Sequence, residues 1–219
     1  MIVRLWRGRV GAARAEEYRV YQEDVGPPNY RVIPGIRRIY MLGRELGAEY
    51  EVAMLTLWES LEAIQAFAGE PVDRARYYER DFDFLIDPPD QVEHFEVFES
   101  GNFDPAGGAR EKLVRLWRGR TELARRDEAI RLEKQVGVPG YRATPGNAGI
   151  WLLGREVDQQ FELAMLTLWE SLKAIRAFAG DPVDRAYYDE YQRRGFDYLI
   201  QAPETVDHFE VLVRERIGA

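Results

Sequence analysis

Hydrophobic and polar positions alternate with two different periods along this chain, and each period predicts a type of element. Residues 2–9 have the two-residue period of a strand, and so do residues 36–45 and 50–58, which a short glycine-containing turn joins into a hairpin. Apolar residues recur at helical spacing between the first two strands, at Ala15, Tyr18, Tyr21 and Val25. We expect this helix to stop at Gly26.

The next elements complete a recognisable order. Ser60 is a suitable N-cap for a helix over residues 61–68, and Glu70-Pro71 predicts the start of another helix with Pro at its first position. Residues 92–98 predict a last strand. The order βαββαβ is that of a ferredoxin-like unit, so the predicted fold class is α+β.

The whole pattern occurs twice. The string AMLTLWESL stands at residues 53–61 and again at residues 164–172, an offset of 111 that becomes 114 after Tyr77 because of an insertion near residues 190–195. Units of roughly a hundred residues are too long for a solenoid, so this is a tandem domain duplication. We expect a first ferredoxin-like unit at residues 1–99, a linker at 100–112 and a second unit at 113–219, with Gly137 stopping the helix that matches the first.

The parity of each strand predicts which side chains lie under the helices. Val3, Leu5, Ala53, Leu55, Leu57, Phe95 and Val97 form an aliphatic set that suits the helix side. The opposite set mixes polar and apolar residues: Arg4, Trp6, Met54, Thr56, Trp58, His94 and Glu96, with their counterparts in the second unit. Such a face is expected to be buried by two units packed sheet to sheet or closed into a barrel.

Composition excludes several classes of protein. The 219 residues are 46% hydrophobic and 31% charged, as in a globular chain with a sizeable core. The absence of cysteine excludes disulfides, thiolate metal sites and cysteine nucleophiles. A net charge of -8 argues against nucleic-acid binding. The opening residues, interrupted by Arg, predict neither a secretory signal nor a membrane span, so a cytoplasmic location is expected.

Several motifs resemble the antibiotic biosynthesis monooxygenase family of the dimeric α+β barrel superfamily. They are the βαββαβ order, the repeated Leu-Trp-Glu-Ser-Leu-x-Ala-Ile-x-Ala-Phe-Ala-Gly stretch, the Pro-Gly turn before the second strand and the terminal His-Phe-Glu-Val. The resemblance implies that the two units form an intrachain pseudo-dimeric α+β barrel, and further self-association stays open. It implies diverse activities, among them cofactor-free oxygenation of aromatic polyketides and heme degradation.

The two histidines, His94 and His208, occupy matching positions and are the candidate catalytic bases. If the resemblance holds, such a base would take a proton from a phenolic or enolic substrate, which could then donate an electron to dioxygen. Duplication alone also leaves a matched pair of histidines, so a structural role is the alternative.

The candidate substrate-binding residues come from the mixed face and from the second strand of each unit. They are Arg4, Trp6, Tyr40, Thr56, Trp58 and Glu96, and in the second unit Arg115, Trp117, Trp151, Thr167, Trp169 and Glu210. Arg4 and Arg115 could clamp an anionic oxygen of the substrate, although an interior ion pair between Arg4 and Glu96 is the simpler expectation. Differences such as Tyr40 against Trp151 indicate that the two pockets have diverged or that one is silent.

No cofactor is expected. One His per unit cannot supply the three or four ligands of a metal site, and no separate signature of heme, the alternative cofactor, is visible. The sequence therefore predicts a cofactor-independent monooxygenase of a small hydroxylated aromatic or polyketide-like substrate. The alternative is a non-catalytic protein of the same fold that binds a small molecule or serves a structural role.

Overall fold

A computed structural model describes residues 1–101, 103, 111–188 and 198–217 of the chain. These residues form two compact units. Unit 1 consists of Met1–Phe95 together with Glu210–Ala219, and unit 2 consists of Glu96–Phe209. The predicted insertion at residues 190–195 and most of the predicted linker lie outside the described residues.

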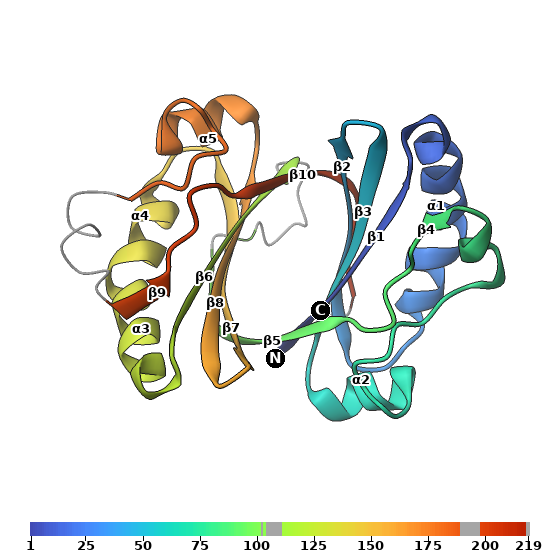
Figure 1. Ribbon diagram of the computed structural model, residues 1–219, viewed down its shortest axis with the longest axis horizontal. Helices are drawn as coiled ribbons and strands as arrows, with labels where there is room; N and C mark the ends of the chain where they lie inside the picture. The colour runs from blue at the N-terminus through green and yellow to red at the C-terminus, as the bar shows by residue number, and fades with distance from the viewer. Residues whose placement is uncertain (102, 104–110, 189–197, 218–219) are drawn as a thin grey trace. The chain divides into compact units, whose positions relative to one another are not determined.

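The first repeat contains the predicted elements in the predicted order (Figure 1). Its strands and helices are β1 (Ile2–Gly11), α1 (Ala15–Arg31), β2 (Ile36–Leu46), β3 (Glu49–Trp58), α2 (Leu61–Ala68), β4 (Leu85–Ile86) and β5 (Glu93–Gly101). Two short 3-10 helices, η1 (Ala12–Arg14) and η2 (Glu79–Asp83), precede α1 and β4.

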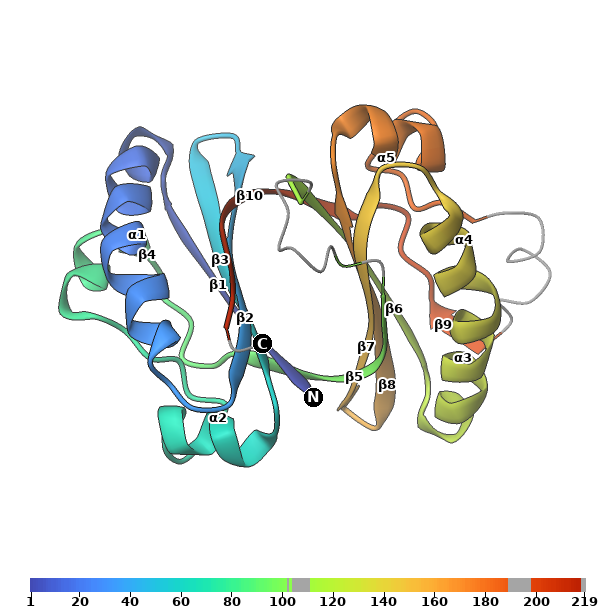
Figure 2. The same cartoon turned by 180° about the vertical axis from the view of Figure 1, so that it is seen from behind.

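The second repeat follows the same plan with a more broken first helix (Figure 2). Its elements are β6 (Leu113–Glu122), η3 (Leu123–Arg125), α3 (Arg126–Leu132), the π-helix η4 (Glu133–Gly137), α4 (Val138–Ala143), β7 (Asn147–Val157), β8 (Gln160–Trp169), α5 (Leu172–Ala179), β9 (Leu199–Gln201) and β10 (Asp207–Arg216). The predicted fold class, α+β with two ferredoxin-like units, is confirmed.

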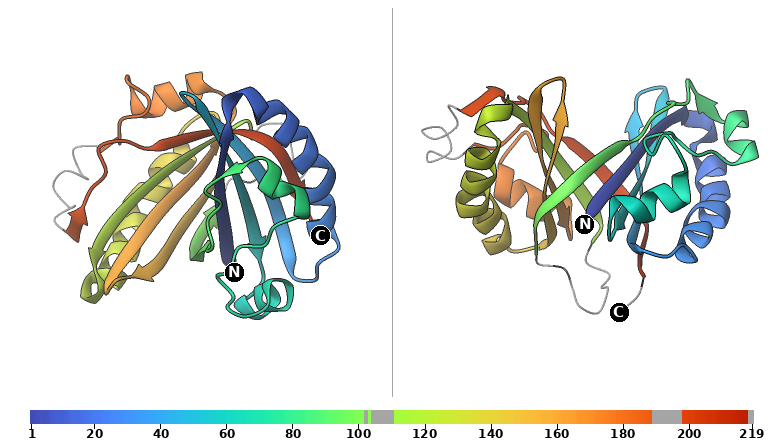
Figure 3. Two further views of the ribbon diagram at one scale, coloured as in Figure 1. Left: turned by 45° about the vertical axis from the view of Figure 1, so that its right-hand side comes forward. Right: turned by 90° about the horizontal axis from the view of Figure 1, so that it is seen from below.

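Each unit takes an edge strand from the other repeat. In unit 1, β3 pairs antiparallel with β1 and β2, and residues 210–216 of β10 pair with β2 (Figure 3). In unit 2, β8 pairs with β6 and β7, and residues 96–101 of β5 pair with β7. The compact units therefore differ from the repeats at 1–99 and 113–219, because the last strand of each repeat continues into the other unit.

The two faces of the sheet are the reverse of those predicted. In unit 1, Met54 and Trp58 pack in one core with Tyr18 of α1 and Ile64 of α2, so the mixed face lies under the helices. The aliphatic set shares the other face, since Val3 pairs with Leu57 in the β1–β3 register. Both faces are almost fully buried, and parity alone therefore could not assign them.

Three predicted helix boundaries are also wrong. At Gly137 the π-helix η4 runs directly into α4, so this glycine does not stop the helical segment. α1 continues through Gly26 to Arg31, and a Cβ on Gly26 would come within 3.0 Å of Gln22 and Met54, so this glycine permits close packing rather than ending the helix. No helix begins at Pro71. The carbonyls of Val72 and Arg74 accept hydrogen bonds from Arg4 instead, so these backbone groups are committed to a tertiary contact.

Candidate functional site

Arg4 is the centre of a polar group on the helix side of unit 1. It extends from β1, is only 4% exposed, and donates from Nη1 to Val72 O at 2.8 Å and from Nη2 to Arg74 O at 2.8 Å. Burial lowers the pKa of Arg4, yet a guanidinium stays charged well above neutral pH. The site therefore keeps a buried positive charge beneath the 69–78 loop.

His94 is the third hydrogen-bond partner of this guanidinium. Its Nε2 lies 3.0 Å from Nη1 of Arg4, and since arginine can only donate, Nε2 accepts. The imidazole is therefore neutral in this arrangement, with its proton on Nδ1. The structure thus brings together two of the predicted site residues, with the lone pair of the candidate base engaged by the candidate clamp.

Tyr30 is a site residue that the sequence reasoning did not single out. Burial raises the pKa of the Tyr30 hydroxyl, and the positive charges of Arg4 and Arg76 oppose that rise. The ring of Tyr30 lies 5.1 Å from that of Phe67, and Arg4 lies 5.8 Å over the same Phe67 ring. The sequence did contain one sign of its importance, since Tyr30 aligns with Tyr141 when the two repeats are superimposed.

A small cavity of about 30 Å³ opens beside this group in unit 1. It is lined by Arg4, Trp6, Tyr18, Gln22, Tyr30, Met54, Arg76, Tyr77, Tyr78, Asp81 and Val92. This volume is enough for about one water molecule. An aromatic substrate would enter only after lining side chains had moved.

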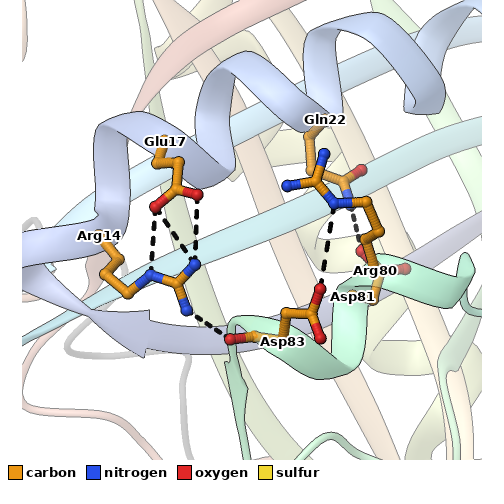
Figure 4. Close-up of polar contacts among 6 residues, drawn as sticks. All are labelled: Arg14, Glu17, Gln22, Arg80, Asp81 and Asp83. Carbon is orange, nitrogen blue, oxygen red and sulfur yellow. Dashed lines mark hydrogen bonds and ion pairs between the residues drawn. The ribbon is translucent and has the colours of Figure 1, made fainter.

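Asp81 brings a buried carboxylate to the same cavity. It accepts from the Tyr18 hydroxyl at 3.1 Å, from Gln22 Nε2 at 2.6 Å and from the backbone N–H of Tyr78 at 2.7 Å. Figure 4 shows Gln22 reaching down from α1 to Asp81 on η2. Burial raises the pKa of Asp81, although the three donors oppose that rise.

Trp6 and Trp117 have the same environment in the two units. Trp6 Nε1 donates to the Tyr77 hydroxyl at 3.2 Å, and Trp117 Nε1 donates to that of Tyr188 at 3.1 Å. Each Trp ring lies over a glycine of its own strand: a Cβ at Gly8 would come within 2.4 Å of Trp6. The rings are therefore fixed as walls on the helix side.

Thr56, Trp58, Thr167 and Trp169 are almost completely inaccessible, at 0–1% exposed. Trp58 Nε1 donates to Thr56 Oγ1 at 2.8 Å, and Trp169 Nε1 donates to Thr167 Oγ1 at 2.9 Å. Each Thr in turn donates to the backbone of the first strand. These contacts make the four residues part of the core beside the site rather than of the cavity lining.

Tyr40 and Trp151 lie away from the other candidate residues. Tyr40 pairs with Leu55 and Trp151 with Leu166, so both belong to the face opposite the helices. Trp151 packs there against Phe103, with ring centroids 4.6 Å apart. The structure does not bring them together with Trp6 and Trp117.

The expected ion pair between Arg4 and Glu96 does not form. Glu96 belongs to unit 2, where it pairs with Arg126 of α3 at 3.1 Å. Its counterpart Glu210 lies in unit 1, opposite Gly43 of β2. The physical reason is the exchange of end strands, which places His94 and Glu96 in different units although they are two residues apart.

Unit 2 repeats the buried guanidinium with different surroundings. Arg115 is 1% exposed and donates to Arg185 O at 2.9 Å. Burial raises the pKa of Tyr141 to about 12, and the positive charge of Arg115 opposes the rise. His208 is half-buried at the position that matches His94.

The buried carboxyl group of unit 2 does not belong to the residue that is equivalent to Asp81 in the repeat. Glu133 of the π-helix is 5% exposed and accepts from the Tyr198 hydroxyl at 2.9 Å. Burial raises its pKa to about 7, and the Tyr198 hydrogen bond opposes the rise. A buried carboxyl with a tyrosine donor is therefore present in each unit.

Unit 2 also has a larger pocket, of about 240 Å³, between its helices. Its lining is Val136, Gly137, Gly140, Tyr141, Thr144, Ala177, Phe178 and Tyr187. Arg115 lies 5.7 Å over the ring of Phe178, one of these lining residues. Three of the eight lining residues are aromatic, and a buried positive charge lies beside them.

Two other features are absent from the described residues. Among them, no cluster of three or more His, Asp or Glu side chains could hold a metal ion. No helix in the described ranges is both long and apolar enough to cross a membrane.

No protein-family profile and no curated protein sequence matches the chain. Solved structures do match it. A protein described as a presumed monooxygenase from Fusobacterium nucleatum aligns with a TM-score of 0.69 at 11% identity, over 100% of this chain and 95% of the other. One with the same description from Lactobacillus acidophilus gives 0.64 at 12% identity, over 100% and 97%. An anthrone oxidase-like protein gives 0.63 at 14% identity, over 100% and 94%.

At these identities the likeness shows the fold alone. These solved structures share the α+β fold of this chain, which carries two ferredoxin-like units. The resemblance seen in the sequence motifs is confirmed at this level.

Proposed function

We propose that the protein is a cofactor-independent monooxygenase of a small hydroxylated aromatic compound, bound on the helix side of a sheet. One observation carries the proposal: in each unit a buried guanidinium lies over a Phe ring that also packs against a tyrosine. The residues are Arg4, Phe67 and Tyr30 in unit 1 and Arg115, Phe178 and Tyr141 in unit 2. A guanidinium suits a phenolate or enolate oxygen, and aromatic rings suit a flat apolar body. The monooxygenase and anthrone oxidase-like descriptions of the structural neighbours support the choice of reaction.

The proposed reaction begins with proton transfer. Nε2 of His94 or His208 takes the proton of the substrate hydroxyl, and the guanidinium stabilises the oxygen anion. In unit 1 this requires Arg4 to move its Nη1 donor from His94 to the substrate. The arrival of the anion would therefore free the lone pair of the base at the moment when it is needed.

Dioxygen is the oxidant in the second stage. The anion donates one electron to dioxygen, and the resulting radical pair combines to a peroxide on the ring carbon. For a substrate with a CH₂ group, such as an anthrone, loss of water then leaves a carbonyl. One oxygen atom stays in the product, and the other leaves as water with the two hydrogens of that CH₂ group.

A non-catalytic binding or structural role is the second candidate function. The specific observation in its favour is that Arg4 already has three partners, namely Val72 O, Arg74 O and His94. The cavity beside it holds only about one water molecule. In this alternative the polar residues of unit 1 satisfy one another.

Oxygen uptake with a panel of quinols and anthrones tests the proposal. We expect consumption above the rate of autoxidation, with His94→Ala, His208→Ala and Arg115→Met assayed separately to locate the active unit. Arg9→Met is the matched control, because Arg9 is an exposed arginine on the same strand as Arg4 and pairs with Glu49. Uptake that none of the three variants reduces, or no uptake with any substrate, would exclude the catalytic assignment.

A further inference from the structure

The pocket of unit 2 has the size and lining of an aromatic binding site. A closed apolar cavity of about 150 Å³ accommodates benzene. This pocket is open to solvent and has both polar and apolar lining atoms, and its volume of about 240 Å³ leaves room for a second fused ring. None of its eight lining residues carries a charge. An ionic group would lose its hydration there without gaining a partner, so an uncharged ligand is favoured.

Three rings form the walls of this pocket. Tyr141 and Phe178 have centroids 4.4 Å apart at an interplanar angle of 31°, and Phe178 and Tyr187 have centroids 5.0 Å apart at 57°. Such rings offer stacked and edge contacts to a flat ligand. Tyr141 also carries a hydroxyl, so one of the three walls has a polar group.

The other repeat supplies an internal comparison, because each lining residue has a counterpart 111 positions earlier. Gly140 corresponds to Asn29, Thr144 to Ile33 and Tyr187 to Arg76.

In unit 1 the residues at these three positions are either larger than their counterparts in unit 2 or charged. Asn29 donates to Val25 O at 2.6 Å, and Ile33 packs against the hydrophobic core. Arg76 lies 5.2 Å over the Phe67 ring and donates to Phe67 O. The equivalent space in unit 1 is therefore occupied by side chains of the protein itself.

The backbone differs at the same place. α1 is one continuous helix of 17 residues, whereas unit 2 passes through a π-helix at Glu133–Gly137 before α4. π-helical segments are frequent at functional sites. A Cβ placed on Gly140 would meet no atom within 4 Å, so this glycine leaves open space at the pocket rather than relieving a clash.

We infer that the pocket of unit 2, opened by Gly140 and Thr144, is an aromatic binding site that the matching place in unit 1 lacks, and that its ligand is an uncharged compound of two fused rings with a hydroxyl group. The inference rests on the proposed function and deepens it, because it names the ligand class and assigns it to one unit. The hydroxyl of Tyr141, a lining residue that interacts electrostatically with Arg115, then orients the ligand hydroxyl, and the matching place in unit 1 takes no ligand.

Calorimetric titration with 2-naphthol tests this inference. We expect one molecule bound per chain, and at least tenfold weaker binding of naphthalene-2-sulfonate. Gly140→Asn with Thr144→Ile, which gives unit 2 the residues of unit 1, should weaken 2-naphthol binding at least tenfold. The reciprocal pair in unit 1, Asn29→Gly with Ile33→Thr, should leave the affinity of the unit 2 site unchanged.

Three results would overturn the inference: two naphthol molecules per wild-type chain, no binding, or undiminished binding by the folded Gly140→Asn/Thr144→Ile variant. Circular dichroism verifies folding, and Tyr187→Arg is the second variant if that pair fails to fold. Failure of the proposed function gives a different pattern, in which naphthol binds as expected but no substrate consumes oxygen. Oxygen uptake that survives in the folded pocket variant would overturn the assignment to unit 2 and leave the proposed function standing.

Discussion

At the scale of single residues, the buried carboxyl groups show how the repeats have diverged. In unit 1 the carboxyl is Asp81 of η2, with Tyr18 of α1 as a donor; in unit 2 it is Glu133 of the helical segment, and the donor is Tyr198. Glu133 corresponds to Gln22, a partner of Asp81 in unit 1. The hydroxyl–carboxyl contact is therefore kept while the chain positions that supply it have changed.

Glu133 should make stability depend on pH. Its pKa rises from 4.5 to about 7 on folding, so the neutral form is favoured and its stability contribution is complete below pH 4.5. That contribution is lost as pH rises from 4.5 to about 7, a change of ~3 kcal/mol at about 1.4 kcal/mol per pKa unit. Glu133→Gln, the residue of unit 1, should remove this loss.

Urea unfolding at pH 5 and pH 8 measures the effect. The free energy of unfolding of Glu133→Gln minus that of the wild type should be larger at pH 8 than at pH 5. Glu128→Gln, at a partly exposed residue of the preceding helix α3, is the control and should show no such increase. An equal difference at both pH values would contradict the prediction.

Arg4 should be important for stability as well as for any chemistry. Arg4→Met removes the donor for two backbone carbonyls of the 69–78 loop and for His94. Leaving a buried acceptor unsatisfied costs about 1–3 kcal/mol, so we expect a loss of about 2–4 kcal/mol in urea unfolding. A loss below ~1 kcal/mol, no greater than that of the exposed control Arg9→Met, would contradict this role.

The residue scale is also where prediction from sequence was weakest. The sequence supplied Arg4, Trp6 and His94 as candidates, and the structure places them together on one face. It could not show that this face lies under the helices, because both faces are apolar enough to be buried. Tyr30 and Asp81 were missed because their roles depend on tertiary contacts with the cavity.

At the scale of elements, local signals predicted the strands and the capped helices well. α2 spans Leu61–Ala68 as expected, and Ser60 accepts from the backbone N–H of Ala63 at 3.3 Å. Ser171 does the same for α5 at 3.2 Å. The incorrect helix start at Pro71 arose where tertiary hydrogen bonds to Arg4 override a local preference.

The two caps should contribute similarly, because their geometry is repeated. Ser60→Ala and Ser171→Ala should each cost about 1 kcal/mol of unfolding free energy. Ser60→Asp and Ser171→Asp, which keep an acceptor for the same backbone N–H, should lose less. Thermal unfolding of the four variants checks this, and an alanine variant as stable as its aspartate counterpart would contradict it.

At the scale of the whole molecule, the exchange of end strands determines which substitutions affect which unit. Leu212, Val213 and Ile217 come from the second repeat but pack in the core of unit 1. Phe98 comes from the first repeat and packs against Phe161 in unit 2, with ring centroids 6.0 Å apart. The duplication was visible in the sequence, whereas this exchange was not, because it depends on where β5 and β10 find partners.

Hydrogen exchange tests this connection. Val213→Ala removes packing from the edge of unit 1, so amide protection should fall in β2 and stay unchanged in β7. Phe98→Ala, the reciprocal change, should lower protection in β7 and leave β2 unchanged. Loss of protection confined to the repeat that carries each substitution would contradict the exchange.

The exchange also has an evolutionary consequence for a duplicated gene. Neither repeat encodes a complete unit, since each lacks the edge strand that its twin provides. A chain reduced to one copy would lack the strand that its sheet takes from the other copy, so it could complete that sheet only with a second chain. A substitution in the last strand of one copy changes the stability of the other copy's sheet. Selection therefore acts on the two halves together, even while their pockets diverge.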